Sequence, residues 1–322
     1  MPWQPSQSQV HVDRILTNIS TAYTQAATNF IASQVFPVVP VDKRTDVYFT
    51  FTKADFQRDE AKQRADGAES AGSGYGISTS SYSCDVFALH KDIGDQTRAN
   101  SDAPLSPDAD ATRFLTQRML IRQEVQFMAD YFVTGVWGTS ATPSNLWDVY
   151  TTSDPISDME TAKRAILLST GYLPNTLVLG YDAFRYLRHH PDIIARIDGA
   201  STATTPALAS QSTLAAIFSV DRVLVPMAVR DTAVEGEAAS RAFIAGANDA
   251  LLCYSNPSPG LLAPSAGYIF NWQGVSQGLG ANIGVSSFRM EHLKATRVEA
   301  EVAFDCALVG TDLGYMFIDV NS

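Results

Sequence analysis

The chain has 322 residues, of which 45% are hydrophobic, so it is long enough to fill one large core or two domains. Its formal net charge is −11 at pH 7, whereas a surface that neutralises phosphate must be positively charged. This argues against tight nucleic-acid binding. No apolar run reaches the length of a membrane span, and the N-terminus lacks the basic start and apolar middle of a secretory signal. The composition predicts a soluble chain made in the cytosol.

From Val12 to Ile31, apolar residues recur at steps of three and four, which predicts a helix with one buried stripe. The segment "VFPVVPV" follows, where Pro37 and Pro40 require extended backbone. The segment "DVYFTFTK" then alternates between two sets of side chains, which is the period of a strand with two different faces. A return strand is predicted from Ile77 to Leu89.

A charged, glycine-rich stretch separates these two strands. Seven of the twelve residues from Arg58 to Glu69 are charged, namely Arg58, Asp59, Glu60, Lys62, Arg64, Asp66 and Glu69. Gly72, Gly74 and Gly76 follow, and they disfavour a packed core and favour a flexible arm. The pattern predicts a long hairpin, which at about 3.3 Å per residue reaches roughly 50 Å.

A long helix is predicted after Ser106, which is suited to the N-cap, with Pro107 in the first turn and acidic residues beside it. About 28 residues at 1.5 Å each make a rod of about 40 Å that ends around Gly135. Its predicted buried stripe, at steps of four, three and four, consists of Ile121, Val125, Met128 and Phe132.

From Asp154 to Tyr254, helix and strand patterns alternate, which predicts a compact α/β module. The tail from Ser286 to Val320 has the character of strands throughout. No internal repeat is present in the sequence. The chain is therefore expected to be an α+β protein.

No group of residues indicates a metal or cofactor site. The cysteines are few and form no CxxC pair, which disfavours a disulfide scaffold or zinc and predicts buried thiols at Cys84, Cys253 and Cys306. His189 and His190 are adjacent, so on a helix they point about 100° apart and cannot hold one ion together. We expect them to end a helix before Pro191, where they complement its dipole.

The sequence Gly274-Val-Ser276-Gln-Gly278 matches the GxSxG nucleophile elbow of serine hydrolases. That elbow needs a helix after the serine, but "LGANIG" is too rich in glycine to form one. His292 is the only later histidine, and Glu291 is the only acid between it and Ser276. A serine hydrolase using Ser276 therefore remains a distant alternative, and no residue is assigned a catalytic role.

The order of elements resembles that of the major capsid proteins of tailed bacteriophages, which have the Hong Kong 97-type capsid fold. The resemblance covers nearly the whole chain. It rests on "FIASQVFPVVPV" leading into the charged hairpin, on "LTQRMLIRQEVQFMADYFVTGVWG", and on "FRMEHLKATRVEAEVAFDCALVGTDLGYMF". It implies an α+β fold with an N-terminal arm (1–45), an extended β-hairpin loop (46–90), a peripheral domain with a long spine helix (91–154), an axial α/β domain (155–254) and the C-terminal strands of the peripheral domain (255–322).

In such capsids the extended loop lies across a neighbouring subunit. The resemblance therefore implies that the seven charged residues from Arg58 to Glu69 contact another copy of the chain. Their charges sum to −1, so they can pair with a partner's charges without creating a large field. A solvated hairpin tip is the alternative interpretation.

The implied function is that of a shell subunit, present in the virion and, before assembly, in the host cytoplasm. Hexamers and pentamers of it would enclose double-stranded DNA without sequence-specific binding. About 45 residues precede the loop, which favours a separate scaffolding protein over a cleaved leader. A portal is a further expected partner, and a decoration protein is a candidate partner. Lys53 and Lys62 are available for a covalent crosslink to a neighbouring subunit. An encapsulin-like protein nanocompartment is the alternative within this fold.

Overall fold

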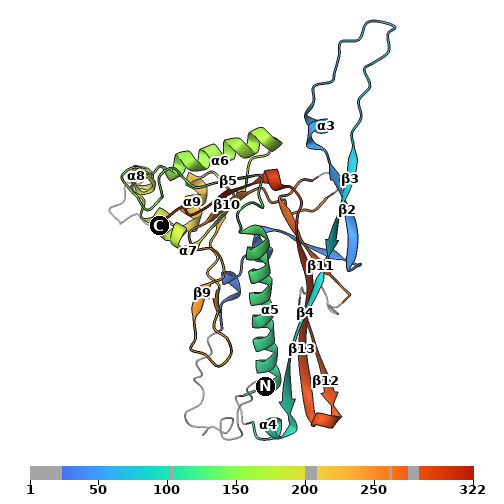
Figure 1. The fold of residues 1–322 in the computed structure, drawn as a ribbon, viewed down its shortest axis with the longest axis vertical. Helices are drawn as coiled ribbons and strands as arrows, with labels where there is room; N and C mark the ends of the chain where they lie inside the picture. Colours follow the sequence, from blue (N-terminus) through green and yellow to red (C-terminus); the bar gives the residue numbers. More distant parts are fainter. Residues whose placement is uncertain (1–23, 102–104, 200–208, 261–262, 275–282) are drawn as a thin grey trace.

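The computed structural model describes residues 24–101, 105–199, 209–260, 263–274 and 283–322. Figure 1 shows an elongated molecule, with a hairpin projecting at one end, a long helix along the middle and a compact lobe to one side. The two larger sheets hold five strands each, one beside the long helix and one in the lobe.

The helix predicted from Val12 to Ile31 lies mostly outside the described residues, and its described end is not an α-helix. That end contains a 3-10 turn, η1 (Ala27–Asn29), followed by the one-turn helix α2 (Ala32–Val35). The reason is tertiary, because the side-chain amide of Gln25 bonds both backbone groups of Val229 at 2.7 and 2.9 Å and draws the segment toward another element.

The first sheet is built around its longest strand, β13. Its five strands are β1 (Val38–Val41), β11 (Gly267–Trp272), β13 (Ala295–Leu308), β12 (Gly284–Met290) and β4 (Asp85–Gly94). β13 pairs antiparallel with β4, β11 and β12, while β1 pairs parallel with β11. The extended backbone predicted around Pro37 and Pro40 is therefore confirmed, as an edge strand where proline is tolerated.

The long predicted helix is confirmed as α5 (Pro107–Tyr131), with Pro107 in its first turn. It packs against β13, β4 and α2. Its buried face is centred on Ala111, Leu115, Met119, Gln123, Glu124, Phe127, Met128 and Tyr131. The predicted stripe was wrong for Ile121 and Val125, which are only half-buried, because the sheet and the arm cover a different side of the helix. Met128 and Phe132 are buried as predicted.

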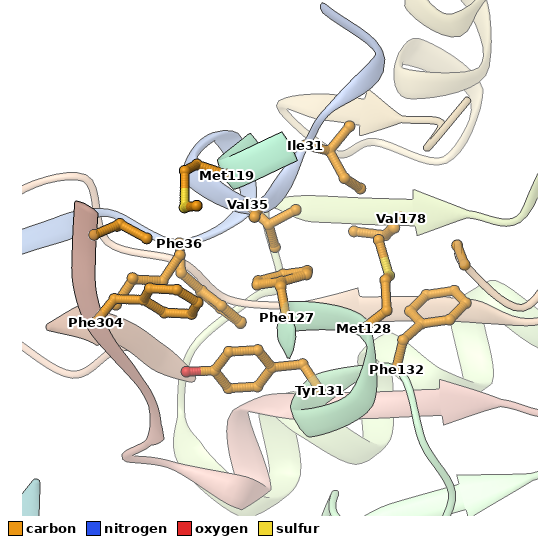
Figure 2. Close-up of a cluster of buried hydrophobic side chains, with 14 of the residues drawn as sticks. Ile31, Val35, Phe36, Met119, Phe127, Met128, Tyr131, Phe132, Val178 and Phe304 are labelled. Carbon is orange, nitrogen blue, oxygen red and sulfur yellow. The ribbon is translucent and has the colours of Figure 1, made fainter. Parts of the chain in front are cut away.

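The main core lies between α5, the arm and the first sheet. Figure 2 shows Phe127 and Tyr131 of α5 gathered around Phe36 of the arm, with Phe304 of β13 beside it. The ring centroid of Phe36 is 4.8 Å from that of Tyr131 and 5.9 Å from that of Phe127. Aromatic pairs at such distances stabilise a core beyond the burial of their surface.

The second sheet belongs to the lobe and has the order β5 (Thr139–Ala141), β14 (Gly314–Phe317), β10 (Ala250–Cys253), β6 (Thr176–Leu179) and β7 (Arg222–Leu224). The lobe's helices are α6 (Pro155–Thr170), α7 (Tyr181–Arg188), α8 (Pro191–Gly199) and α9 (Gln211–Ile217). A small hairpin of β8 (Val229–Asp231) and β9 (Arg241–Phe243) leaves the lobe. The alternation predicted from Asp154 to Tyr254 is confirmed, whereas α8 was not predicted.

The arm joins the two halves of the molecule. The carbonyl of Val35 accepts hydrogen bonds from the Ser255 hydroxyl at 2.6 Å and from Arg222 Nη2 at 3.3 Å, both on the lobe side. On the other side, the Glu124 carboxylate of α5 accepts the amides of Ile31 and Ala32 at 3.0 to 3.2 Å. The short helix α2 is therefore capped by a side chain from another element.

Candidate interaction surface

The projecting hairpin consists of β2 (Thr45–Phe51) and β3 (Ile77–Ser83), with the short helix α3 (Lys53–Gln57) after β2. Both predicted strands are present, but the return strand is interrupted at Cys84. Cys84 and Arg44 close the hairpin with hydrogen bonds of 2.9 and 3.0 Å, and β4 then leaves it to pair with β13. The free part of the hairpin therefore ends before Leu89.

All seven charged residues predicted as a contact lie on the connection between α3 and β3, which forms neither helix nor strand. Six of them are exposed and Glu60 is half-buried. Arg58 Nη1 lies 3.7 Å from Asp55 Oδ1 and 3.8 Å from Glu60 Oε1, and Glu60 also accepts from the Ser73 hydroxyl. Exposed pairs of this kind contribute about 0 to 1 kcal/mol.

The other charged residues of the connection have no ionic partner in the described ranges of the chain. Across the described ranges, Asp59, Lys62, Arg64, Asp66 and Glu69 form no ion pair, and Arg64 donates only to the Ala68 carbonyl. Their charges are therefore available to a partner molecule or to solvent.

One face of the hairpin holds it to the body of the molecule. The Tyr48 ring lies 5.7 Å, and the Tyr82 ring 4.5 Å, from the ring of Phe270 on β11. The Ser83 amide also donates to Asp305 of β13 at 2.8 Å. These contacts cover only the side of the strands that carries the tyrosines.

The opposite face of the hairpin is apolar and uncovered. Val47, Phe49 and Ile77 are 57%, 58% and 57% exposed. Toward the tip, Phe51 lies in contact with two further exposed rings, with centroids 5.9 Å from Phe56 and 6.1 Å from Tyr75. We call Val47, Phe49, Phe56, Tyr75 and Ile77 the hairpin face. An apolar surface rimmed by charge is typical of an interaction site.

The hairpin face was not predicted from the sequence, although the alternation that produces it was present. The alternation in "DVYFTFTK" indicates two faces, but both carry large rings, so the pattern does not say which face meets the body. The register Val47↔Ser81, Phe49↔Thr79 and Phe51↔Ile77 places the apolar set together on one side.

Just beyond the end of β2, Lys53 ties the hairpin to the lobe. Its Nζ forms an ion pair with Asp312 in η3 (Thr311–Leu313) and donates to the Ser169 hydroxyl of α6 at 3.1 Å. Lys53 therefore already has partners in its own chain, whereas Lys62 is free for a partner.

The candidate hydrolase serine, Ser276, lies outside the described residues, and His292 is exposed in η2 (Glu291–Leu293). A different serine, Ser153, has its Oγ 2.9 Å from His190 Nε2. The Ser153 hydroxyl donates to the Val149 carbonyl at 2.8 Å, and the Asp192 amide donates to His190 Nδ1 at 3.3 Å. The imidazole proton is therefore on Nε2, which is the opposite of the tautomer that a serine triad needs.

His190 is thus a structural residue that links the loop before α6 to the turn between α7 and α8. It is fully buried, and burial lowers its pKa, so the ring is neutral. This corrects the expectation that both histidines complement the helix dipole at the end of α7, where only His189 occupies the C-cap.

Among the described residues, no three His, Cys, Asp or Glu side chains gather into a group that suits a metal ion. No helix in the described part of the chain is both long and apolar enough to span a membrane.

Comparison with known proteins relates the chain to phage shells. No protein-family model matches it. The major capsid protein of Burkholderia phage BcepMu is 26% identical over a 322-residue alignment. The alignment covers 96% of this chain and 97% of that protein. Among solved structures, a phage-related protein from Bordetella bronchiseptica RB50 is 24% identical with a TM-score of 0.68, over 92% of this chain and 93% of that one. A capsid chain of cyanophage P-SCSP1u is 10% identical with a TM-score of 0.61, over 100% of both chains.

The chain has the Hong Kong 97-type capsid fold. The α+β class expected from the order of elements is confirmed with it. The same capsid fold occurs in an encapsulin from Synechococcus elongatus PCC 7942, which is 12% identical with a TM-score of 0.57, over 96% of this chain and 95% of that one. The capsid fold by itself therefore does not distinguish a phage shell from a protein nanocompartment.

Proposed function

We propose that this chain is the major capsid protein of a tailed phage and that its copies assemble into the icosahedral shell around the double-stranded DNA genome. The likeness to the BcepMu major capsid protein supports this, because it spans 96% of the chain rather than one motif. The observation that carries the proposal is the projecting hairpin. Its apolar face and most of its charges have no partner among the residues that the structure describes, so the hairpin is suited to contact another copy.

The proposal assigns roles to the parts of the chain. Residues 1–45 are the N-terminal arm, 46–90 the extended loop, 91–154 and 255–322 the peripheral domain with α5 as the spine helix, and 155–254 the axial domain, although β5 and β14 from the flanking ranges pair into the sheet of that axial domain. Hexamers and pentamers form the shell in the virion, after synthesis in the host cytoplasm. A separate scaffolding protein and a portal assist, a decoration protein is a further candidate, and the net charge of −11 suits DNA that is confined rather than bound.

The second candidate is an encapsulin-like nanocompartment, which the shared fold with an encapsulin favours. It is the weaker candidate, because the phage capsid protein is 26% identical to this chain, whereas the encapsulin is only 12% identical. The content of particles from the native source distinguishes the two, since DNA indicates a virion and a bound enzyme indicates a nanocompartment. We also infer a non-catalytic role, and an esterase screen of the wild type and Ser276→Ala tests the hydrolase alternative.

Expressed alone, the chain is expected to form shells, capsomers or aberrant sheets rather than a stable monomer of 34.8 kDa. The physical reason is that the hairpin buries its apolar face only by association. Light scattering and negative-stain microscopy measure this in low and in moderate salt, with and without a scaffolding protein. A monodisperse monomer at high concentration under all these conditions would contradict a shell role.

Reversing the charge at Arg58, Lys62 and Arg64 to glutamate is expected to leave the fold intact and to weaken assembly. The change takes the net charge of the seven residues from −1 to −7, and its repulsion recurs at every contact of a shell. Circular dichroism reports the fold and sedimentation reports the particles. At 1 M salt, where the Debye length is about 3 Å, assembly should partly recover.

The matched control for that variant is Arg58→Lys with Lys62→Arg and Arg64→Lys, which keeps every charge. It should assemble like the wild type. Normal particles from the charge-reversed chain at low salt would mean that the charged run is only a solvated tip.

A further inference from the structure

A second uncovered apolar surface lies at the end of α6, close to the start of α3 in the hairpin. Leu167 and Leu168 in the last turn are 42% and 77% exposed, and Tyr172 and Leu173 just beyond it are 40% and 59% exposed. We call these four residues the α6 patch. Gly171, at φ 81°, ends the helix in the left-handed conformation, so the chain turns out of the helix between Leu168 and Tyr172.

The α6 patch lies near the hairpin of its own chain, because Lys53 of the hairpin contacts Ser169 of α6. Ser169, which accepts the Lys53 hydrogen bond at 3.1 Å, lies between Leu168 and Tyr172 in the sequence. Beyond α3, the connection to β3 projects away from the lobe (Figure 1). Both surfaces stay exposed in the same chain, so neither covers the other.

Charges beside the two surfaces complement each other. Arg164 is exposed one turn before Leu168 and has no ion-pair partner in the part of the chain that the structure describes. On the hairpin, Asp59 is exposed and unpaired three residues after Phe56. An unpaired cation borders one apolar surface and an unpaired anion borders the other, which favours their association in one orientation.

We propose that the α6 patch of one copy is the docking surface for the hairpin face of a neighbouring copy. This rests on the proposed shell function and names the surface that receives the hairpin. A contact between two different surfaces of identical chains is heterologous, so every copy has one surface to give and one to receive, and repetition builds rings and closed assemblies. Both surfaces that such a contact requires are present on this chain, and their side chains are exposed in the described part of it.

The proposal is tested with two singly substituted chains, Phe49→Cys and Leu168→Cys, distinguished by a size tag and assembled together. A short bismaleimide should link the two different chains in the particles. The native Cys84 and Cys253 are buried and Cys306 is half-buried. Burial raises the pKa of Cys84 to about 11, that of Cys253 to about 12 and that of Cys306 well above its ordinary value, so their background reaction is low. The matched control replaces Leu168→Cys with Val234→Cys, because Val234 is also 77% exposed but lies on the tip of the β8–β9 hairpin.

A heterodimer yield at least tenfold above that of the Val234→Cys control is expected. Equal yields from intact particles would overturn the proposed docking surface and leave the shell function standing. A second pair of variants covers the case in which the cysteine chains do not assemble. Leu168→Asp should reduce particle yield at least tenfold with an unchanged circular dichroism spectrum, and Val234→Asp should not. Particles from Leu168→Asp in wild-type yield would equally overturn the docking surface, whereas a wild-type chain that never assembles would remove the shell function itself.

Discussion

Replacing Met128 with aspartate is expected to prevent folding of the chain. Met128 is 5% exposed, and its side chain points into the main core beside Phe132 and Val178 (Figure 2). A carboxylate there has no cationic partner among the described residues of the core, so the change costs several kcal/mol. Because domains are stable by only about 5 to 15 kcal/mol, this is a large part of the total. Circular dichroism and solubility measure the outcome.

The control for Met128→Asp is Ala129→Asp, one residue further along the same helix. Ala129 is exposed, so its variant should fold and unfold like the wild type. If Met128→Asp instead remains soluble with unchanged thermal unfolding, this side of α5 is not a core face in solution.

The stability of the chain is expected to fall between pH 5 and pH 8 because of Glu124. Its side chain is 1% exposed, and its carboxylate accepts the Ile31 and Ala32 amides but forms no ion pair with any residue that the structure describes. Burial raises the pKa of Glu124 from 4.5 to about 7, although the two amides partly oppose the shift. The folded state therefore binds the proton of the Glu124 carboxyl group more tightly than the unfolded state does.

The direction of the pH effect follows from that difference. The stabilisation is fully present below pH 4.5, where both states are protonated, and it is lost as the pH rises through about 7. At about 1.4 kcal/mol per unit of pKa, the loss is roughly 3 kcal/mol. Urea unfolding of the wild type at a series of pH values measures this loss.

Glu124→Gln is the matched variant, because glutamine keeps the shape and an accepting oxygen but does not titrate. Burial also raises the pKa of Asp249 and Asp305, and these groups act equally in both proteins. The difference between the two curves therefore isolates Glu124, and the variant should lose less stability at pH 8. Parallel curves would show that Glu124 is ionised without cost in the folded chain, so that the arm does not desolvate it.

Signals between near neighbours in the sequence were enough to place most elements. Ser106 and Pro107 mark the start of α5, and the period-2 alternation marks β2 and β3. Such signals are local because capping, proline geometry and strand alternation depend on the residue itself and its neighbours. For the same reason the charged run from Arg58 to Glu69 was visible from composition as an exposed segment.

The side of each element that is buried was decided by contacts between distant residues. α5 has more than one apolar stripe, and the sheet and the arm selected the one with Leu115 and Phe127 rather than Ile121 and Val125. β3 and β4 are adjacent in the sequence but separate at Cys84, because β4 pairs with the edge of β13. No local pattern specifies such a partner, since the hydrogen bonds of a strand can be satisfied by any free edge.

The candidate interaction surface, too, was predictable from the sequence only in part. The sequence alone determined that a charged hairpin tip exists, because seven charged residues in a short run cannot enter a core. Only the tertiary structure decided that the tyrosine face meets Phe270, which lies 222 residues after Tyr48 and 188 residues after Tyr82, and leaves Val47, Phe49 and Ile77 uncovered. Alternation shows that a strand has two faces. Which face is buried depends on the surface that packs against it and excludes water, and residues from the whole chain contribute to that surface.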